Sequence, residues 1–522
     1  MGDFLGDTAL TSPCIAIESV SDTARQHPSR DGLHDNWSAL NNPQVIEAAG
    51  FLVFAKHRKM PAPGCWPAKS WCFAMGPKPT PPESGDLYRS RLDQILDDRH
   101  ELFRLAALID WDRFDQELGR FYQPLGRPAK PTRLMVGLSY LKHTFNLSDE
   151  AVVERWRENP YWQWFCGCEF FQHEMPCDAS SLTRWRKRVG PEGLETLLAA
   201  TIQAGLDSGA VRAASLERIS VDTTVQPKAI THPTDAKLYL KALQALVRQA
   251  KRRGISLRQT HTRLAKRAAI QVSRYAHARQ MRRMRRELKR LKTYLGRVYR
   301  DVARKVAGDD NLFARFAGLL GLTERLLVQE RTSKNKLYSL HASEVVCLAK
   351  GKAHRPYEFG CKVAVAVTNR EGFVLASKAL EGNPYDGHTL TTTLDQVIAL
   401  TGIEPERVYV DRGFRGHDYA NKERVFISGQ RRGLTPTIQR ELKRRSAIEP
   451  MIGHMKEDGR LGRNYLLGST GDAMNALLAA AGHNLRLILT WLGLFVAWFI
   501  AALMSSSAHA DASHEASNPT AA

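Results

Sequence analysis

Two short apolar runs that each end in an aspartate most constrain how this chain can fold. The first is "ISVD", which ends at Asp222, and the second is "VYVD", which ends at Asp411. Apolar runs of this length, rich in β-branched and aromatic residues, are typical of strands buried inside a sheet. A carboxylate at the end of such a strand faces the crevice edge where α/β folds place their chemistry. The polar residues at 223–224 and 412–413 predict exit turns.

The order of patterns around these two runs predicts the fold class. After the first strand comes a long helical insertion, about 235–335. The segment "HRPYEFGCKVAVAVTNREGFVLASKALEG" predicts a β-hairpin that turns at "NREG". A helix over "GHTLTTTLDQVIALTG", the strand with Asp411, the short strand "RVFISG" and a long helix with Glu449 follow. This order predicts a mixed α/β sheet with helices packed against it.

The insertion is strongly basic. Its segment "MRRMRRELKRLK" holds seven basic residues in twelve. Apolar residues recur there at alternating steps of three and four, at Met281, Met284, Leu288, Leu291, Leu295 and Val298. This spacing predicts a seam that packs against another helix, with Arg and Lys on the outer faces. Two interpretations stay open, a pure scaffold and a helix that faces phosphates.

Residues 87–205 predict a helical region. In "PTRLMVGLSYLKHTFNLSDEAVVERWRENP" two helical runs are split at "NLSDE". Ser148 is a good N-cap, and Asp149 and Glu150 suit the first turn of the second helix. Two helices across a tight turn are typical of a helix-turn-helix that docks on DNA. An ordinary α-helical hairpin is the alternative.

Charge and cysteine content bear on the partner and on a possible zinc site. Lys and Arg total 75 against 54 Asp and Glu, which leaves a net charge of +21 and favours a nucleic-acid partner. The segment "CGCEFFQHEMPC" offers Cys166, Cys168, His173 and Cys177 as zinc ligands. The C-x-C spacing is tight and the segment is crowded with aromatic residues, so we favour an aromatic core segment.

Three carboxylates form the candidate site. Glu449 lies on a helix 38 residues beyond Asp411, and that helix could bring it beside both strand ends. Taken singly, each aspartate is more often a turn or cap residue. Taken together in a basic chain, three converging carboxylates repel one another and require cations. Hard oxygen ligands suit two Mg²⁺ or Mn²⁺ ions, which could cleave a phosphodiester.

The chain resembles the bacterial insertion-sequence transposases of the IS5/IS4 type, which are DDE transposases with an RNase H-like catalytic domain. The resemblance covers about 76–490. It rests on "VDTTVQPKAITHPTDAKL", "KVAVAVTN", "GNPYDGHTL", "VYVDRGFRGHDY" and "RRSAIEPMIGHMKEDGRLGRNYLLG", in that order. The N-terminal block "LMVGLSYLKHTFNLSDEAVVERWRENPYWQWFCG", with "SSLTRWRKRVG" after it, also looks like that family's N-terminal domain.

The resemblance implies a role for each site residue. The family's glutamate motif is Tyr-x2-Arg-x3-Glu-x6-Lys, and Arg445, Glu449 and Lys456 fall on that spacing. The tyrosine position holds Leu442, which puts one DNA-contact or positioning role in doubt. Asp222, Asp411 and Glu449 would hold two Mg²⁺ or Mn²⁺ ions. Arg445 and Lys456 would contact DNA.

The resemblance also implies the reaction. Metal-activated water would cut at the element's terminal inverted repeats, and the freed 3′-hydroxyl would attack target DNA without a covalent protein–DNA intermediate. The helical N-terminal region would read the repeats, and synapsis would need a homo-oligomer. A transposase-derived DNA-binding protein that no longer cuts, and a metal-dependent nuclease of the same fold, remain the alternatives.

The resulting domain prediction has four parts. Residues 1–84 form an irregular extension, with Met75 a plausible true start. Residues 85–210 form the helical DNA-binding domain, and 211–486 the RNase H-like domain with its insertion. Residues 487–522 form an apolar helix and a disordered tail, in which 487–504 is a weak transmembrane candidate. The expected location is the bacterial cytoplasm, with the nucleoid.

Overall fold

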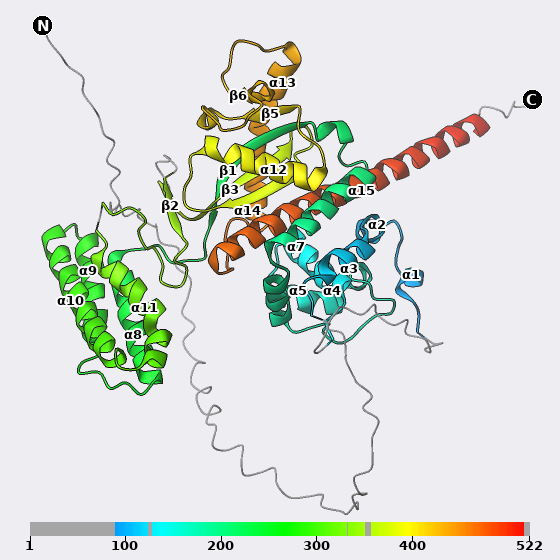
Figure 1. The fold of residues 1–522 in the computed structure, drawn as a ribbon. Coiled ribbons are helices and arrows are strands. Elements are labelled where there is room, and N and C mark those ends of the chain that lie inside the picture. Colours follow the sequence, from blue (N-terminus) through cyan, green and yellow to red (C-terminus); the bar gives the residue numbers. More distant parts are fainter. Residues whose placement is uncertain (1–88, 124–127, 331, 350–355, 516–522) are drawn as a thin grey trace, which may run out of the picture.

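The computed structural model describes residues 89–123, 128–330, 332–349 and 356–515. The predicted irregular segment 1–84 and the proposed start at Met75 lie outside the described residues. The centre of the molecule is a sheet with helices around it, and a separate helical bundle stands beside the sheet (Figure 1).

The sheet is mixed, as predicted. Its six strands follow the order β2-β3-β1-β5-β6, and β4 also pairs with β3. β3 runs antiparallel to β1, β2 and β4, whereas β1, β5 and β6 run parallel. The strands are β1 (Arg218–Pro227), β2 (Val346–Ala349), β3 (Tyr357–Thr368), β4 (Val374–Leu380), β5 (Arg407–Val410) and β6 (Val425–Ile427).

The first aspartate lies inside its strand and not at its end. In β1, Asp222 stands opposite Val365 of β3, and pairing with β3 continues as far as Pro227. The prediction of an exit turn at 223–224 is therefore wrong, because β3 is long enough to pair with the polar residues as well. The turn at 412–413 is confirmed, since β5 ends at Val410 and a 3₁₀ turn, η3 (Arg412–Phe414), follows.

Three helices pack against the strands of the sheet. α12 (Leu390–Thr401) follows the 3₁₀ turn η2 (Asp386–Thr389) and buries Leu390, Leu394 and Val397 at helical spacing against β4 and β3. α14 (Ile448–Glu457) packs against β1. α15 (Gly468–Glu515) packs along β4 and also along α7 and α4.

The N-terminal helices share one core with the sheet. They are α1 (Leu92–Ile95), α2 (Glu101–Leu108), α3 (Trp111–Gly119), α4 (Thr132–Thr144), α5 (Asp149–Glu158), α6 (Pro160–Phe165) and α7 (Ala179–Asp207). A single buried cluster runs from Leu102 through β1, β3 and β5 to Leu492 of α15. Arg486 of α15 donates to the carbonyl oxygens of His143 at 2.9 Å and Asp458 at 3.1 Å, so it joins the ends of α4 and α14.

The insertion folds as a bundle of four helices with a core of its own. These are α8 (Asp235–Arg252), α9 (Thr262–His277), α10 (Met281–Val306) and α11 (Asp310–Val328). Leu291, Leu295 and Val298 are buried in that core, which confirms the predicted seam. Met281 is 36% exposed, so the seam begins one turn later than predicted.

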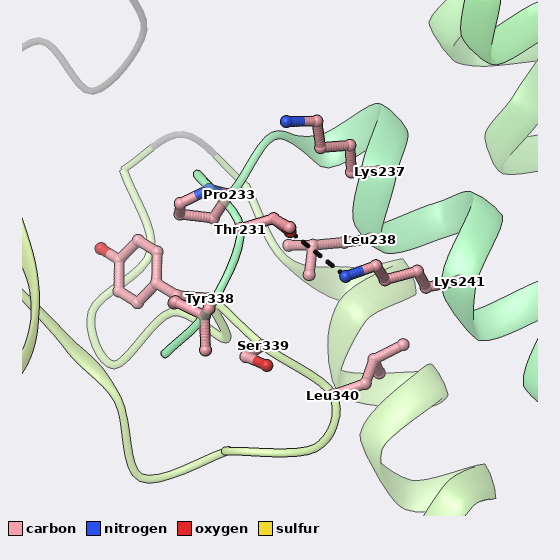
Figure 2. Close-up of a pocket in the computed structure, with 9 residues that line it drawn as sticks. Thr231, Pro233, Lys237, Leu238, Lys241, Tyr338, Ser339 and Leu340 are labelled. Carbon is pink, nitrogen blue, oxygen red and sulfur yellow. Dashed lines mark hydrogen bonds between the residues drawn. The ribbon is translucent and has the colours of Figure 1, made fainter. Parts of the chain in front are cut away.

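The two ends of the insertion meet in a narrow neck (Figure 2). Thr231 and Pro233 on the way in, and Tyr338, Ser339 and Leu340 on the way out, line a pocket of about 10 Å³, room for about one water molecule. The Lys241 ammonium lies 3.2 Å from the Thr231 hydroxyl and closes one side.

The cysteine-containing segment is a core segment, as we favoured. Cys166 and Cys177 are buried with Phe165 and Phe170, whereas His173 is exposed and contacts the Phe171 ring. Burial raises the pKa of the Cys166 thiol well above its usual value. The thiols therefore serve packing here.

One helix in the described part of the chain, over Gly468–Leu494, passes the length and composition criteria for a membrane span. However, 61% of its apolar window is buried inside the protein, as in a core helix. The predicted candidate at 487–504 lies within α15 and shares residues 487–494 with this stretch, where Trp491 and Leu494 are exposed. A span there stays a prediction.

Candidate active site

The parallel pairing of β1 with β5 brings the two aspartates together. In this register Ile219 stands beside Val408 and Ser220 beside Tyr409. Two further steps along both strands bring Asp222 level with Asp411. The sheet itself, and not a flexible loop, therefore holds Asp222, and Asp411 follows directly where β5 ends.

The Asp222 carboxyl carries the electrostatic signature of this proximity. Its pKa is raised from 3.8 to about 6, and burial is the largest cause of this net shift. A hydrogen bond from the Thr223 backbone N–H lowers the pKa, the charges of Asp411 and Glu449 raise it, and Arg445 lowers it. The charges of Asp411 and Glu449 thus both act on the pKa of Asp222. A carboxyl whose pKa is perturbed by burial and by neighbouring charges, as that of Asp222 is, is typical of functional sites.

The glutamate comes from a helix that the structure breaks in two. The predicted long helix consists of α13 (Pro436–Arg444), a 3₁₀ turn η5 (Arg445–Ala447) and α14, with Glu449 in the first turn of α14. The break has a local cause in Pro450. Proline has no N–H to donate to the preceding turn, and it is tolerated only near the start of a helix.

Arg445 lies between two of the carboxylates. Its Nη1 is 3.7 Å from Asp222 Oδ2, and its Nη2 is 3.9 Å from Glu449 Oε1. Its side chain is 11% exposed, whereas that of Glu449 is 69% exposed. Nη1 is buried and has no hydrogen-bond partner among the described residues. An arginine in this position can offset the negative charge of both carboxylates.

The other two positions of the glutamate motif are less involved. Lys456 lies seven residues after Glu449 on α14 and is half-buried. Leu442, at the family's tyrosine position, is also half-buried in α13. The neighbouring Glu441 accepts hydrogen bonds from Tyr409 and, at 3.0 Å, from Arg407, so α13 is fixed to β5 beside the site.

A fourth carboxylate reaches the site and was not singled out from the sequence. Asp386 Oδ1 accepts a hydrogen bond from the Thr223 hydroxyl at 2.8 Å and lies 2.5 Å from the Lys362 ammonium. Lys362 also donates to the Pro384 carbonyl at 2.7 Å. The sequence signal was available, because "GNPYDGHTL" places an acid at the start of a helix directly after a strand.

Gly413 is required where Asp386 and Asp411 approach each other. A Cβ at this position would lie 2.9 Å from Asp411 Oδ1 and 3.0 Å from Asp386 Oδ2. Its backbone N–H donates to Asp411 Oδ1 at 2.7 Å. The glycine therefore leaves room for two carboxylates in one place and orients one of them.

These residues suit a divalent cation better than an acid–base pair. Two adjacent carboxylates, one with a raised pKa, are a hard oxygen donor set whose repulsion a cation would relieve. Within the described ranges no group of three or more His, Cys, Asp or Glu side chains is arranged around a common metal position. Glu449 is linked to Asp222 only through Arg445, so the arrangement offers two close ligands and a third nearby.

The predicted helix-turn-helix has the expected helices, α4 and α5, with Ser148 as N-cap. Their surfaces differ from what DNA docking needs. Every residue of α4 except Arg133 is buried. Asp149 is held by Lys142 at 2.8 Å and by Arg186 at 2.5 Å, so it serves as an internal clamp. The exposed side of α5 mixes three glutamates with two arginines.

Comparison with known proteins agrees with this geometry. Residues 90–188 match the family described as "Transposase domain (DUF772)", and residues 331–485 match "Transposase DDE domain". The second match contains Asp411 and Glu449, whereas Asp222 lies before it. A DDE domain implies an RNase H-like fold for the mixed sheet.

One curated relative is the protein "Uncharacterized protein ORF8 in nfe locus" of Rhizobium meliloti. It is 66% identical over 205 residues, which are 39% of this chain and 99% of that protein. No solved structure matches the chain. The chain belongs to the same family as the Rhizobium meliloti protein, and its matched domains make it a transposase that carries a DDE domain.

Proposed function

We propose that this protein is an active insertion-sequence transposase of the IS5/IS4 type. It cleaves DNA at the terminal inverted repeats of its element and transfers the freed 3′ ends to target DNA. The single observation that carries the proposal is the register of β1 with β5, which brings Asp222 level with Asp411. Glu449 joins this pair through Arg445.

Asp222, Asp411 and Glu449 would hold Mg²⁺ or Mn²⁺, in two ions if the site fills completely. Bound ions of this kind supply a nucleophile at neutral pH and balance the charge of the leaving oxygen. The chain's own residues supply the rest. Arg445 orients a DNA phosphate, and Lys456 contacts the strand beside it. Asp386 and Lys362 hold the η2 turn so that Asp411 keeps its place.

The helical N-terminal region would read the terminal repeats. In the first half of α7, before the kink at Gly190, Arg184, Lys187 and Arg188 are exposed on a helix that begins at the N-cap Asp178. Cleavage at both ends of an element requires that two ends meet, so the protein would work as a homo-oligomer, in the cytoplasm with the nucleoid.

The test is cleavage of a labelled duplex that carries the element's own terminal repeat, in Mg²⁺. Glu449→Gln keeps the shape of the side chain and removes its charge, so it should bind the duplex and not cut it. Glu457→Gln is the matched control, because Glu457 is an exposed glutamate on the same helix. It should cut like the unmodified protein.

The result separates three cases. Cleavage that is lost in Glu449→Gln and kept in Glu457→Gln supports the three-carboxylate site. Binding without cleavage by the unmodified protein would mean a DNA-binding relic and refute the proposal. Joining of a cut 3′ end to a second duplex is the further readout, since cleavage without joining indicates a nuclease.

A further inference from the structure

The helical insertion carries nearly all of the protein's excess positive charge. Between residues 235 and 328 the sequence holds 25 lysines and arginines against six aspartates and glutamates. The bundle α8–α11 therefore has a net charge of +19, whereas the whole chain has +21. A net charge this concentrated generates a strong local potential for a polyanion.

The charge is further ordered along one helix. Five exposed basic residues of α10 follow one another at steps of four, three, eight and three, on the side of the helix away from the buried seam. We call these five side chains the basic stripe: Arg282, Arg286, Lys289, Arg297 and Arg300. From its first to its last residue the stripe extends for about 27 Å, at 1.5 Å per residue. This is most of one turn of duplex DNA, about 34 Å.

On α9 and α10, no acidic side chain is left to oppose the stripe. The acids of α10 are Glu287 and Asp301, and each is engaged on its own helix. Glu287 pairs with Arg290 at 2.9 Å, and Asp301 with Lys305 at 3.3 Å. The adjacent α9 contains no acid and exposes Arg263, Lys266, Arg267 and Arg274.

The bundle does not need these charges to fold. Its helices bury Leu291, Leu295 and Val298 with their neighbours in a closed core, so the apolar side of α10 is already occupied. In Figure 1 the bundle stands beside the sheet, with α9 and α10 on its outer side. A basic helix whose apolar face is covered presents only its charged face to a partner.

We propose that the basic stripe of α10 binds the phosphates of duplex DNA and gives the bundle the role of a sequence-independent DNA-holding arm. This inference rests on the proposed function, because that function makes DNA the substrate. Of the two interpretations of the insertion left open by the sequence, the inference takes the helix that faces phosphates over the pure scaffold. It also separates two tasks, since the bundle holds the duplex and the N-terminal helices read it.

The test is the salt dependence of binding to a random 30-base-pair duplex, measured by fluorescence anisotropy with the full chain. The stripe variant R282Q/R286Q/K289Q/R297Q/R300Q should lose up to about 4.5 from the slope of log K against log salt, at ~0.9 per phosphate contact. At low salt its affinity should fall by ~100-fold or more. A variant with lysine at all five positions keeps the charges and should bind like the unmodified protein.

The matched control removes five exposed charges elsewhere on the bundle, as R248Q/K251Q/R252Q/R253Q/R315Q. An equal loss in both variants would overturn the stripe, because bulk charge alone would then explain binding. Duplex RNA that displaces DNA at lower concentration would overturn the choice of partner. If the stripe variant keeps its slope while the unmodified protein cuts terminal-repeat DNA, the inference fails and the proposed function stands.

Discussion

At the scale of single residues, burial and the neighbouring carboxylates destabilise the charged form of Asp222. Its pKa is raised to about 6 in the folded protein, from about 3.8 in an unfolded chain. Between these values the folded state binds more protons than the unfolded state, so stability falls as the pH rises from 4 to 6. Above pH 6 the cost is constant, at about 3 kcal/mol for a shift of two units.

Removal of that charge should therefore stabilise the protein. Without divalent ions, Asp222→Asn should melt at a higher temperature than the unmodified chain at pH 7.5, and the difference should vanish near pH 4. Mn²⁺ should raise the melting temperature of the unmodified protein and leave that of Asp222→Asn nearly unchanged. A difference that does not depend on pH would contradict the assignment of the raised pKa.

The pair of Asp386 and Lys362 is a second prediction at this scale. Lys362 is 8% exposed, so loss of its carboxylate partner would leave a nearly buried charge. Asp386→Asn should cost about 3 kcal/mol of stability, and addition of Lys362→Met should recover part of that loss. Asp395→Asn, an exposed acid on α12, is the control. Additive effects in urea unfolding would show that the pair does not interact.

At the scale of elements, the exposed charges of the two candidate DNA-reading helices, α5 and the first half of α7, predict opposite effects on DNA binding. The exposed side of α5 carries Glu150, Glu154 and Glu158, which repel phosphates. The first half of α7 exposes basic residues. R184A/K187A should therefore reduce the preference for terminal-repeat DNA over a scrambled duplex by ~10-fold, the effect of about 1.4 kcal/mol.

The control on α5 is R155A/R157A, which removes the same charge from the predicted recognition helix. It should leave the preference for the terminal repeat close to that of the unmodified protein. The reverse result would restore the helix-turn-helix formed by α4 and α5 as the reading element. Electrophoretic mobility shifts with both duplexes in competition measure the ratio directly.

Strand content and helix content were predictable from periodicity, whereas three features were not. The length of β1 beyond Asp222 depends on pairing with β3, which lies far from β1 along the chain. The break before Glu449 had a visible cause in Pro450, but its effect on the direction of α13 did not follow from local spacing. Asp386 lies within the segment "GNPYDGHTL", yet only its contact with Thr223 identifies it with the site.

At the scale of the whole molecule, the two buried cores do not coincide with the domains predicted from the order of segments in the sequence. The predicted boundary near residue 210 falls within one continuous core, because α7 and α4 pack against α15. The insertion lies inside the catalytic part of the sequence but has a separate core. Sequence periodicity reveals that a helix has an apolar face and does not say which neighbour covers that face.

The neck that joins the bundle to the sheet (Figure 2) bears on how the chain folds during synthesis. Pro227 of β1 must pair with Gly360 of β3, which leaves the ribosome about 130 residues later. The bundle between them depends on contacts between neighbouring helices, so it should fold first. Its folding brings the two ends of the insertion together and should lower the entropy cost of closing the sheet by about 1 kcal/mol.

Pulse-labelled hydrogen exchange during refolding measures this order. Amides of α8–α11 should gain protection before those of β1 and β3, and Leu291→Ala in the bundle core should delay protection of the sheet. Simultaneous protection of both parts would rule the order out. If the bundle is protected first, the insertion acts within the chain as an internal assembly aid, which holds the first strand of the catalytic sheet ready for a partner that has not yet been made.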